Sequence, residues 1–456
     1  MTSLKSYYRV NSRVGEWCAS LVLICLILSR WQTEQYLQVT DRLMLILAAF
    51  LTGSSYSARF HIKEHRLLVI MITVTVYLVS GISIGSLVCV VGLIAYQKCL
   101  PLLLYYFPGS FTFGESCITL QSTIMFIAHA ITSLSHALQN YNKPTEAMDC
   151  FTIIAQLIFL SEALLFLSPL IPGLAWTNCP TFFYFSSIFV FCGLTFPLSM
   201  WILQEGPEMF ILPYIMNSKF TIQLILFWIF LVIIAILKVG QKSGTTSKAT
   251  TAERKIFHGL IVAVIISGVI VDIEFTYFAS LIVLAIFLYL EYIRAFDIRP
   301  LSRLLDESFM RFTDEKDQGT LVLTNIYLLV GTFLPLWITY DLTSANKLVM
   351  LSGALSVGIG DSAASIVGSC YGYYKWPYSP KKSVDGTIAS VVSQVLLLII
   401  LAFASVIHHG YVSRAFLPIV ITSLIEAHTT QVDNLVLPLT MYILFSAQDL
   451  FYPVPQ

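Results

Sequence analysis

Residues 358–387 read GIGDSAASIVGSCYGYYKWPYSPKKSVDGT, a stretch in which one acid and several glycines interrupt an otherwise apolar part of the chain. Small residues follow the acid at helical spacing, so that one helix face would carry Asp361, Ala364, Gly368 and Gly372. Eight residues later comes a basic and hydroxyl-bearing segment that contains Lys381, Lys382, Ser383, Asp385, Gly386 and Thr387. The two parts together form the most distinctive pattern in the chain.

These residue types suit the binding of a polyphosphate. Glycines let a bulky anion approach the backbone, lysines neutralise its charge, and an acid such as Asp361 can hold the Mg²⁺ that accompanies a nucleotide. Gly358 and Gly360 predict a helix break just before Asp361, which would then cap a new helix whose amide end faces a phosphate. The alternative is a small-residue packing face followed by a basic turn. The acid favours the first interpretation, because an ionisable group inside a membrane segment is costly and usually functional.

The pattern D-x-x-A-x-x-x-G-x-x-x-G, followed after eight residues by K-K-S-x-D-G-T, resembles the CTP-binding motif of the polyprenol kinase family. That family includes dolichol kinases, phytol kinases and CTP-dependent diacylglycerol kinases. It usually has Glu where this chain has Asp385, so the charge is kept on a shorter side chain. The resemblance implies that CTP is the phosphoryl donor, with Mg²⁺ or another divalent cation, and that all ten motif residues from Asp361 to Thr387 bind it.

The composition is that of a polytopic membrane protein. Of 456 residues, 57% are hydrophobic and 11% charged, whereas soluble domains carry about a quarter charged residues. The formal net charge is zero and nine cysteines are scattered without a C-x-x-C pair, so we expect no nucleic-acid partner, zinc site or disulfide framework. Apolar runs near the spanning length predict an all-α fold with roughly 13–15 transmembrane helices. The candidate spans are 16–30, 42–58, 67–82, 84–106, 117–138, 151–171, 181–203, 219–238, 256–273, 275–293, 320–340, 347–370, 387–406, 412–427 and 434–450.

The chain divides near residue 240. Residues 1–239 form an N-terminal multi-span membrane region, residues 240–255 a polar basic linker, and residues 256–456 a catalytic membrane domain that contains the motif at 361–387. By the positive-inside tendency, the linker is cytosolic. Counting spans in pairs from the linker returns the chain to the same membrane face at 294–319, 371–386 and 426–433. We therefore expect four charged segments to converge on one face.

Arg254, Lys255 and His258 lie at the start of a span and are helical neighbours. One interpretation is a basic flank at the membrane interface, and the other is a phosphate clamp. An Arg-Lys pair followed by His is similar to the family, which favours the clamp. We then expect Arg254 and Lys255 to stabilise charge on the transferring phosphoryl group.

Residues 291–320 mix charges with an apolar stripe, which predicts an amphipathic helix along the interface. Most of these charges suit a solvated face. Asp314 and Asp317 differ because they come just before the next span, so each is a candidate metal ligand. The string FTDEKDQG followed by IYLLVGTFLPLW resembles dolichol kinases in particular.

Glu426, Thr430 and Asp433 share one face if residues 423–439 form a continuous helix. The two acids would then lie about 10 Å apart along the axis, too far to chelate one small ion side by side. We expect them to flank a phosphoryl-transfer site in which Asp433, or less readily Glu426, orients the attacking hydroxyl. The alternative is a pair of acids at the membrane edge.

The resemblance spans about residues 251–440, and the long N-terminal region favours dolichol kinases within the family. It implies transfer of the CTP γ-phosphate to dolichol, which supplies the lipid carrier for protein glycosylation. The setting would be the endoplasmic reticulum membrane, with the active site facing the cytosol and the polyprenol and bilayer as partners; protein partners are not identified. Alternatives are a kinase of another lipid alcohol such as diacylglycerol or phytol, a cytidylyltransferase that attacks the α-phosphate, and a secondary transporter.

Overall fold

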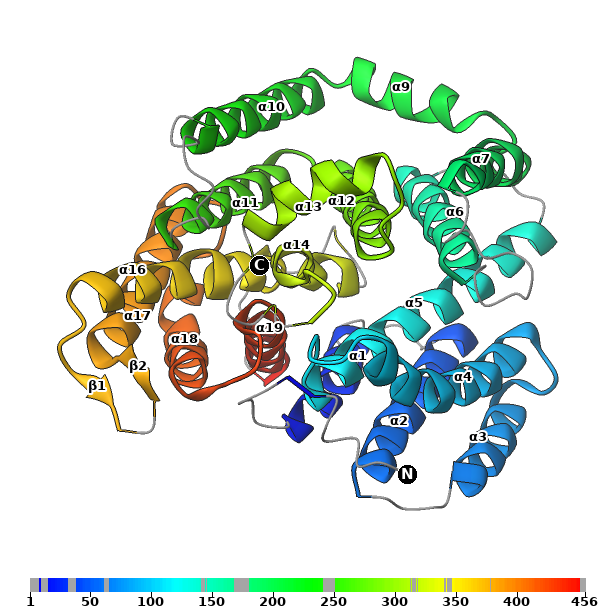
Figure 1. Cartoon of the computed structure of the whole chain (residues 1–456), viewed down its shortest axis with the longest axis horizontal. Helices are drawn as coiled ribbons and strands as arrows, with labels where there is room; N and C mark the ends of the chain where they lie inside the picture. Colours follow the sequence, from blue (N-terminus) through cyan, green and yellow to red (C-terminus); the bar gives the residue numbers. More distant parts are fainter. Residues whose placement is uncertain are drawn as a thin grey trace.

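The chain folds almost entirely into helices (Figure 1). The computed structural model describes residues 8–9, 15–31, 38–60, 65–140, 144, 146–167, 180–240, 251–311, 313, 317, 319–339, 342, 347–377 and 379–451. The N-terminal elements are η2 (Glu16–Ser20), α1 (Leu21–Trp31), α2 (Val39–Arg59), α3 (His65–Ser80), α4 (Ile84–Tyr106), α5 (Phe113–Asn140), α6 (Ala147–Leu167), α7 (Pro180–Val190), η5 (Phe191–Thr195), α8 (Phe196–Leu203), α9 (Pro207–Asn217) and α10 (Lys219–Gly240).

The C-terminal elements include the only two strands among the described residues. They are α11 (Thr251–Val271), α12 (Ile273–Ala295), α13 (Leu301–Arg311), α14 (Thr324–Ile338), α15 (Lys347–Met350), η6 (Ala354–Asp361), α16 (Ser362–Cys370), β1 (Lys375–Trp376), β2 (Ser379–Ser383), α17 (Val384–Phe403), α18 (Gly410–His428) and α19 (Asp433–Phe451). The strands pair antiparallel as a small hairpin at the left edge of Figure 1.

The prediction of an all-α polytopic membrane protein is confirmed, and each expected span overlaps a helix of the described residues. Within the described residues, nine helices are long and apolar enough to cross a membrane, and three more apolar helices are shorter. Helix α9 was not expected. It begins at Pro207 directly after Gly206, a position where proline suits the first helical turn.

The main hydrophobic core joins the two ends of the chain. Buried residues of α1, such as Leu21 and Cys25, share one cluster with Leu439 and Tyr442 of α19. Figure 1 shows α1 and α19 near the centre, with α2 to α4 at the lower right and α16 to α18 at the left. Helices from both sides of the predicted boundary near residue 240 therefore pack in one core. The boundary itself stays a prediction, since residues 241–250 of the linker lie outside the described part.

The expected helix break before Asp361 is wrong. Residues Ala354–Asp361 form a π-helix that continues directly into α16, and Asp361 is itself helical, with φ −62° and ψ −34° and no capping hydrogen bond. Its glycines serve packing instead. A Cβ atom on Gly358 would collide with Val262 of α11, and one on Gly360 would lie 2.5 Å from Nε2 of Gln394 in α17. A π-helical turn often marks a functional site.

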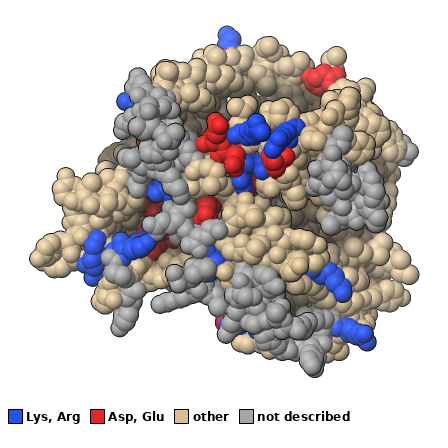
Figure 2. All heavy atoms as spheres, viewed as in Figure 1, with Lys and Arg blue, Asp and Glu red and all other residues tan. Residues whose placement is uncertain are grey.

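The charged segment after α12 does form a helix, α13, as predicted. Its Phe309 is buried and lies against Phe287 of α12, with ring centroids 6.3 Å apart. Leu301 and Leu304 stay exposed. Figure 2 shows acidic and basic side chains gathered over α12 and α13. The position of α13 along a membrane interface remains a prediction.

Candidate active site

Asp361 meets α11 at the end of the π-helix. Its Oδ2 atom lies 2.6 Å from Nζ of Lys255 and 3.8 Å from Nε2 of His258. Lys255 and His258 face the same acid because they are three residues apart on a helix. The backbone carbonyl of Arg254 is 3.2 Å from Nδ1 of His258, which fixes the orientation of the ring. The pairing joins residues that are 106 positions apart in the sequence.

The chain reverses between Glu426 and Asp433, so the continuous helix expected there is wrong. Helix α18 ends at His428, Thr429 is extended with ψ 144°, and α19 begins at Asp433. Thr429 Oγ1 accepts a hydrogen bond of 3.2 Å from the amide of Gln431. Local side-chain bonds of this kind compete with helix formation. The reversal brings together two acids that a helix would keep apart.

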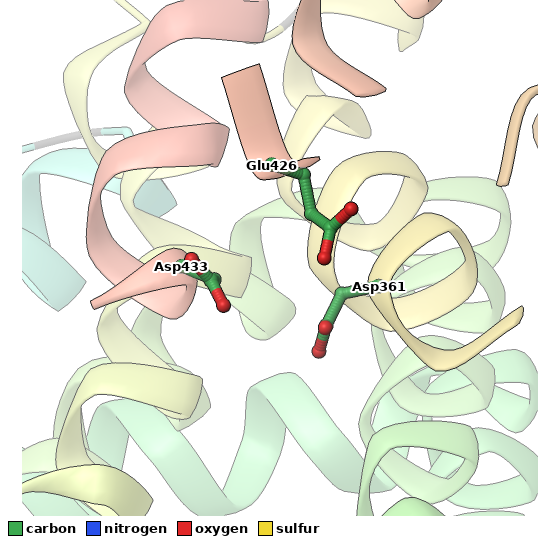
Figure 3. Close-up of side chains that lie close together, drawn as sticks. All are labelled: Asp361, Glu426 and Asp433. Carbon is green, nitrogen blue, oxygen red and sulfur yellow. The ribbon is translucent and has the colours of Figure 1, made fainter. Parts of the chain in front are cut away.

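Asp361, Glu426 and Asp433 therefore form one group, contributed by η6, α18 and α19. One carboxylate oxygen from each lies within 4.8 Å of the others. Figure 3 shows the three side chains directed into a common space between the ends of their helices. Hard divalent cations such as Mg²⁺ prefer carboxylate oxygens, so the donor set fits Mg²⁺.

Lys382 of β2 reaches into this group from the hairpin. Its ammonium pairs with Glu426 and lies 3.6 Å from Oδ2 of Asp433. Burial opposes its charge, but the carboxylates of Asp433, Glu426 and Asp361 outweigh burial and raise the pKa of Lys382. Lys382 therefore stays protonated at physiological pH.

Lys255, Lys382 and the acids Glu426 and Asp433 come from three of the four segments that the counting of spans predicted to converge, and Asp361 joins them from the span 347–370. Their position on one membrane face stays a prediction. Figure 2 shows acidic and basic side chains together over the region of α16 to α18. The predicted segment 294–319 belongs instead to the charges over α12 and α13. Three carboxylates meet two lysines in this cluster, so acidic side chains outnumber the ammonium groups that they contact.

The small-residue face of α16 packs against the start of α17. A Cβ atom on Gly372 would lie 2.6 Å from Oγ of Ser383, and one on Gly386 would lie 2.8 Å from the carbonyl oxygen of Ala364. A Cβ atom on Gly368 would lie 2.9 Å from Oγ of Ser383. Close helix packing accounts for these residues, so the phosphate cradle expected from them stays a prediction.

The rest of the motif holds the hairpin on α17. Ser383 caps α17 by accepting a 3.1 Å bond from the amide of Gly386. Asp385 Oδ2 accepts from the amide of Tyr374 at 3.1 Å. Thr387 Oγ1 accepts from the Trp376 indole at 3.1 Å. These bonds fix the strand from which Lys382 projects, whereas Lys381 beside it is exposed.

The structure does not add the other candidate ligands to the three-acid group. Asp317 accepts hydrogen bonds from the amides of Leu323 and Thr324 and from the Thr324 hydroxyl, at 3.1, 3.2 and 2.6 Å, and so caps α14. Asp314 lies outside the described residues. Arg254 is half-buried on α11 next to Lys255. The metal role of both aspartates and the clamp role of Arg254 stay predictions.

Sequence reasoning missed a buried polar network behind the acids. Gln394 Nε2 donates to Ser390 Oγ at 3.0 Å and to Ser423 Oγ at 3.2 Å, which ties α17 to α18. The three side chains are almost fully buried. The sequence signal was a serine and a glutamine four residues apart inside an apolar span, which places both on one helix face.

A family model described as dolichol kinase matches residues 67–347, more than half of the chain. The chain belongs to the dolichol kinase family. The part of the chain that the dolichol kinase model matches includes Lys255 and His258 and ends before Asp361.

Individual relatives in the dolichol kinase family extend the match. A Mus musculus dolichol kinase is 33% identical over 387 residues, covering 80% of this chain and 71% of the relative. A Homo sapiens dolichol kinase is 33% identical over 396 residues, 82% of this chain and 72% of the relative. The dolichol kinase sec59 of Schizosaccharomyces pombe is 30% identical over 291 residues, 60% of this chain and 56% of the relative. No solved structure matches the chain.

Proposed function

We propose that this chain transfers the γ-phosphate of CTP to the hydroxyl group of dolichol, giving dolichyl phosphate and CDP. Membership of the dolichol kinase family makes it a kinase of a polyprenol lipid. The resemblance of residues 361–387 to a CTP-binding motif supports CTP as the donor. The observation that carries the proposal is the group of Asp361, Glu426 and Asp433 with Lys255 and Lys382, because phosphoryl transfer needs positioned charges of both signs.

The three carboxylates would hold a divalent cation, with Mg²⁺ the best fit to an all-carboxylate set. When bound, Mg²⁺ neutralises charge on the nucleotide phosphates. Their distribution over three elements means that the site exists only when η6, α18 and α19 are packed together. Asp314 and Asp317 remain candidates for a further ligand.

The lysines would bind phosphate oxygens. Each ammonium now pairs with a carboxylate, Lys255 with Asp361 and Lys382 with Glu426. A bound triphosphate offers them stronger partners, because its oxygens carry more negative charge. Arg254 precedes Lys255 and would add a planar donor to the same phosphate. These cations would stabilise the charge that spreads over the transferring group.

Asp433 would orient the alcohol. In the transfer, the dolichol oxygen forms a bond to the γ-phosphorus while the bond from that phosphorus to the β-phosphate oxygen breaks. The alcohol proton passes to a nearby carboxylate, for which Asp433 is the first candidate and Glu426 the second. Asp433 stands at the first position of α19, where the chain backbone fixes it beside the other acids.

We further propose that the site faces the cytosol at the endoplasmic reticulum membrane. Lys255, Glu426 and Asp433 lie near the ends of α11, α18 and α19, Asp361 lies where η6 continues into α16, and the hairpin that carries Lys382 lies between α16 and α17. A very apolar polyprenol can present its hydroxyl to a nucleotide only at a membrane boundary. A basic linker at 240–255 supports the cytosolic side.

The test is a phosphorylation assay on purified protein. CTP labelled at the γ-phosphate and CTP labelled at the α-phosphate are supplied in parallel, with dolichol, phytol or diacylglycerol as acceptor. We expect label in dolichol from the γ-position only. Label from the α-position would assign a cytidylyltransferase, and label in another lipid would change the substrate. No label in any lipid, from protein shown to be folded, would contradict the proposal.

A further inference from the structure

The turn between α18 and α19 is held by the N-terminal half of the chain. Glu115 Oε1, at the start of α5, accepts a 2.7 Å hydrogen bond from the amide of Val432. The carbonyl of Val432 accepts from the amides of Leu435 and Val436 at 3.1 and 3.2 Å, so Val432 precedes α19 as its N-cap residue. Asp433 follows it directly. Glu115 therefore fixes the backbone next to an acid of the candidate active site.

Glu115 does this while capping its own helix. Its Oε2 accepts from the amide of Thr112 at 2.9 Å, and its amide donates to Oγ1 of Thr112 at 3.2 Å. This is the reciprocal arrangement of a capping box, which the sequence Thr112-Phe-Gly-Glu115 allows. A capping box uses one carboxylate oxygen. The second oxygen of Glu115 is thus available for Val432, and the side chain is fully buried, with 0% exposed.

Two further contacts attach the same turn. Arg9 Nη2 lies 2.8 Å from Glu115 Oε1 and 3.4 Å from the carbonyl oxygen of Thr430. Thr112 Oγ1 donates to Oε1 of Gln431 at 2.5 Å. Arg9, Thr112 and Gln431 are at most 5% exposed. Arg9, Thr112 and Glu115, here named the turn clamp, therefore hold three successive residues, 430 to 432.

We propose that the turn clamp sets the position of Asp433 relative to Glu426, and that Glu115 is a positioning residue for the metal site. The role of the acids rests on the function proposed above. A buried ion pair is a costly way to gain stability, since apolar residues of similar size often serve as well. The ion pair does, however, hold the Glu115 carboxylate where it accepts a hydrogen bond from the amide of Val432. A displacement of about 1 Å at a reacting group can lower a rate by roughly a hundredfold.

The main test variant is Arg9→Met/Glu115→Leu in the full-length chain. It replaces the ion pair by apolar side chains of similar volume, which preserves packing, but it removes the acceptor for the Val432 amide. The near-isosteric Glu115→Gln is the second variant. Two quantities are measured for each: the rise in melting temperature caused by Mn²⁺ alone, and kcat with its half-saturating Mg²⁺ concentration in the dolichol assay.

The matched control is Arg294→Met/Glu291→Leu. Like Glu115, Glu291 binds an arginine and a backbone amide that precedes a helix. It pairs with Arg294 at 2.7 Å and accepts from the amide of Val322 at 2.7 Å, just before α14. Glu291 belongs to α12, and the partners of its carboxylate are Arg294 and the amide of Val322. Its replacement removes an equal number of buried charges without touching the turn.

For the clamp variants we expect the half-saturating metal concentration to rise about tenfold and kcat to fall about tenfold, the usual scale for residues that orient metal ligands. The Mn²⁺-induced rise in melting temperature should shrink, while the control keeps it. Folded Arg9→Met/Glu115→Leu protein with wild-type metal response would overturn the proposal, as would an equal loss in the control. If wild-type protein phosphorylates no lipid, the function fails, but the Mn²⁺ measurement still decides whether the clamp positions a metal site.

Discussion

Lys382 is the residue that links the hairpin to the acids. It extends from β2 to Glu426 in α18 and to Asp433 in α19, and the acids hold its charge in place. Its ammonium therefore competes with any metal ion for the same oxygens. The same charge would stabilise a phosphate group. Lys382 should therefore weaken metal binding in a titration and increase the rate of phosphoryl transfer.

Replacement of Lys382 by methionine separates the two effects. We expect Lys382→Met to lower the half-saturating Mg²⁺ concentration several-fold, because the competing cation is gone, and to lower kcat about tenfold, because a phosphate partner is lost. Both values come from one set of initial rates at varied Mg²⁺. A parallel loss of metal affinity and rate would show that Lys382 supports the metal site rather than competing with it.

Asp361 is the acid that pairs with Lys255 of α11 and lies near the imidazole of His258. We expect Asp361→Asn to lower kcat at least about a hundredfold, since it removes one of three metal ligands and changes the partner of Lys255. The measurement is γ-phosphate transfer to dolichol, with gel filtration in detergent as the check on folding. Normal turnover in the folded variant would exclude Asp361 from the site.

At the scale of elements, the contact between α16 and α17 decides whether the motif can present Lys382. Gly386 has no room for a side chain, because a Cβ would meet the carbonyl of Ala364 at 2.8 Å. The backbone there cannot move without moving Ser383 and the hairpin. The small residues of the motif are thus needed in the protein without any ligand.

We expect Gly386→Ala to destabilise the protein and Gly53→Ala to stabilise it. Both glycines lie within helices, where alanine gains up to about 1 kcal/mol. Nothing lies within 4 Å of the Cβ built on Gly53, whereas overpacking at Gly386 costs about 1–3 kcal/mol. Thermal melting without nucleotide measures both. Unchanged melting of Gly386→Ala with a raised KM for CTP would instead support the phosphate cradle.

Elements were the scale at which the sequence was most informative. Apolar runs of spanning length locate helices because the period and composition act locally. The π-helix at 354–361 was missed since glycine is locally unfavourable in a helix, and only the neighbours Val262 and Gln394 explain it. The turn after His428 was missed for a similar reason: spacing alone favoured a helix, whereas Glu115, hundreds of residues away, stabilises the start of α19 at Val432.

The candidate site was predicted in part. Asp361, Lys382, Glu426 and Asp433 were identified individually, because ionisable residues near apolar spans are rare. Their meeting as one group was expected only as convergence on a membrane face. The distance between Glu426 and Asp433 was wrong because it followed from a helix that does not exist. A turn held by distant side chains leaves little signal in the local sequence.

At the scale of the whole molecule, the half of the chain with the candidate site is not packed by itself. Helix α1 lies in the same core as α14 and α19, and the turn clamp joins residues 9, 112 and 115 to residues 430–432. The N-terminal half therefore contributes to the geometry of the acids, although none of its described residues belongs to their group.

A chain divided within residues 241–250 tests this dependence. We expect residues 251–456 expressed alone to show no dolichol kinase activity, because Val432 and the inner face of α19 lose their partners. Co-expression with residues 1–240 should restore activity, since the contacts between the halves are non-covalent. Full activity of the C-terminal piece alone would contradict the packing argument.

The contact between α1 and α19 also has a consequence for biosynthesis. Cys25 Sγ lies 3.8 Å from the carbonyl oxygen of Leu439, 414 residues further along the chain. The ribosome makes α1 early and α19 late, so the two helices meet only after the intervening spans have entered the bilayer. During that interval the buried face of α1 is open to membrane chaperones and proteases. A nascent polypeptide that stalls before α19 keeps this face exposed, and the cell can recognise it as unfinished.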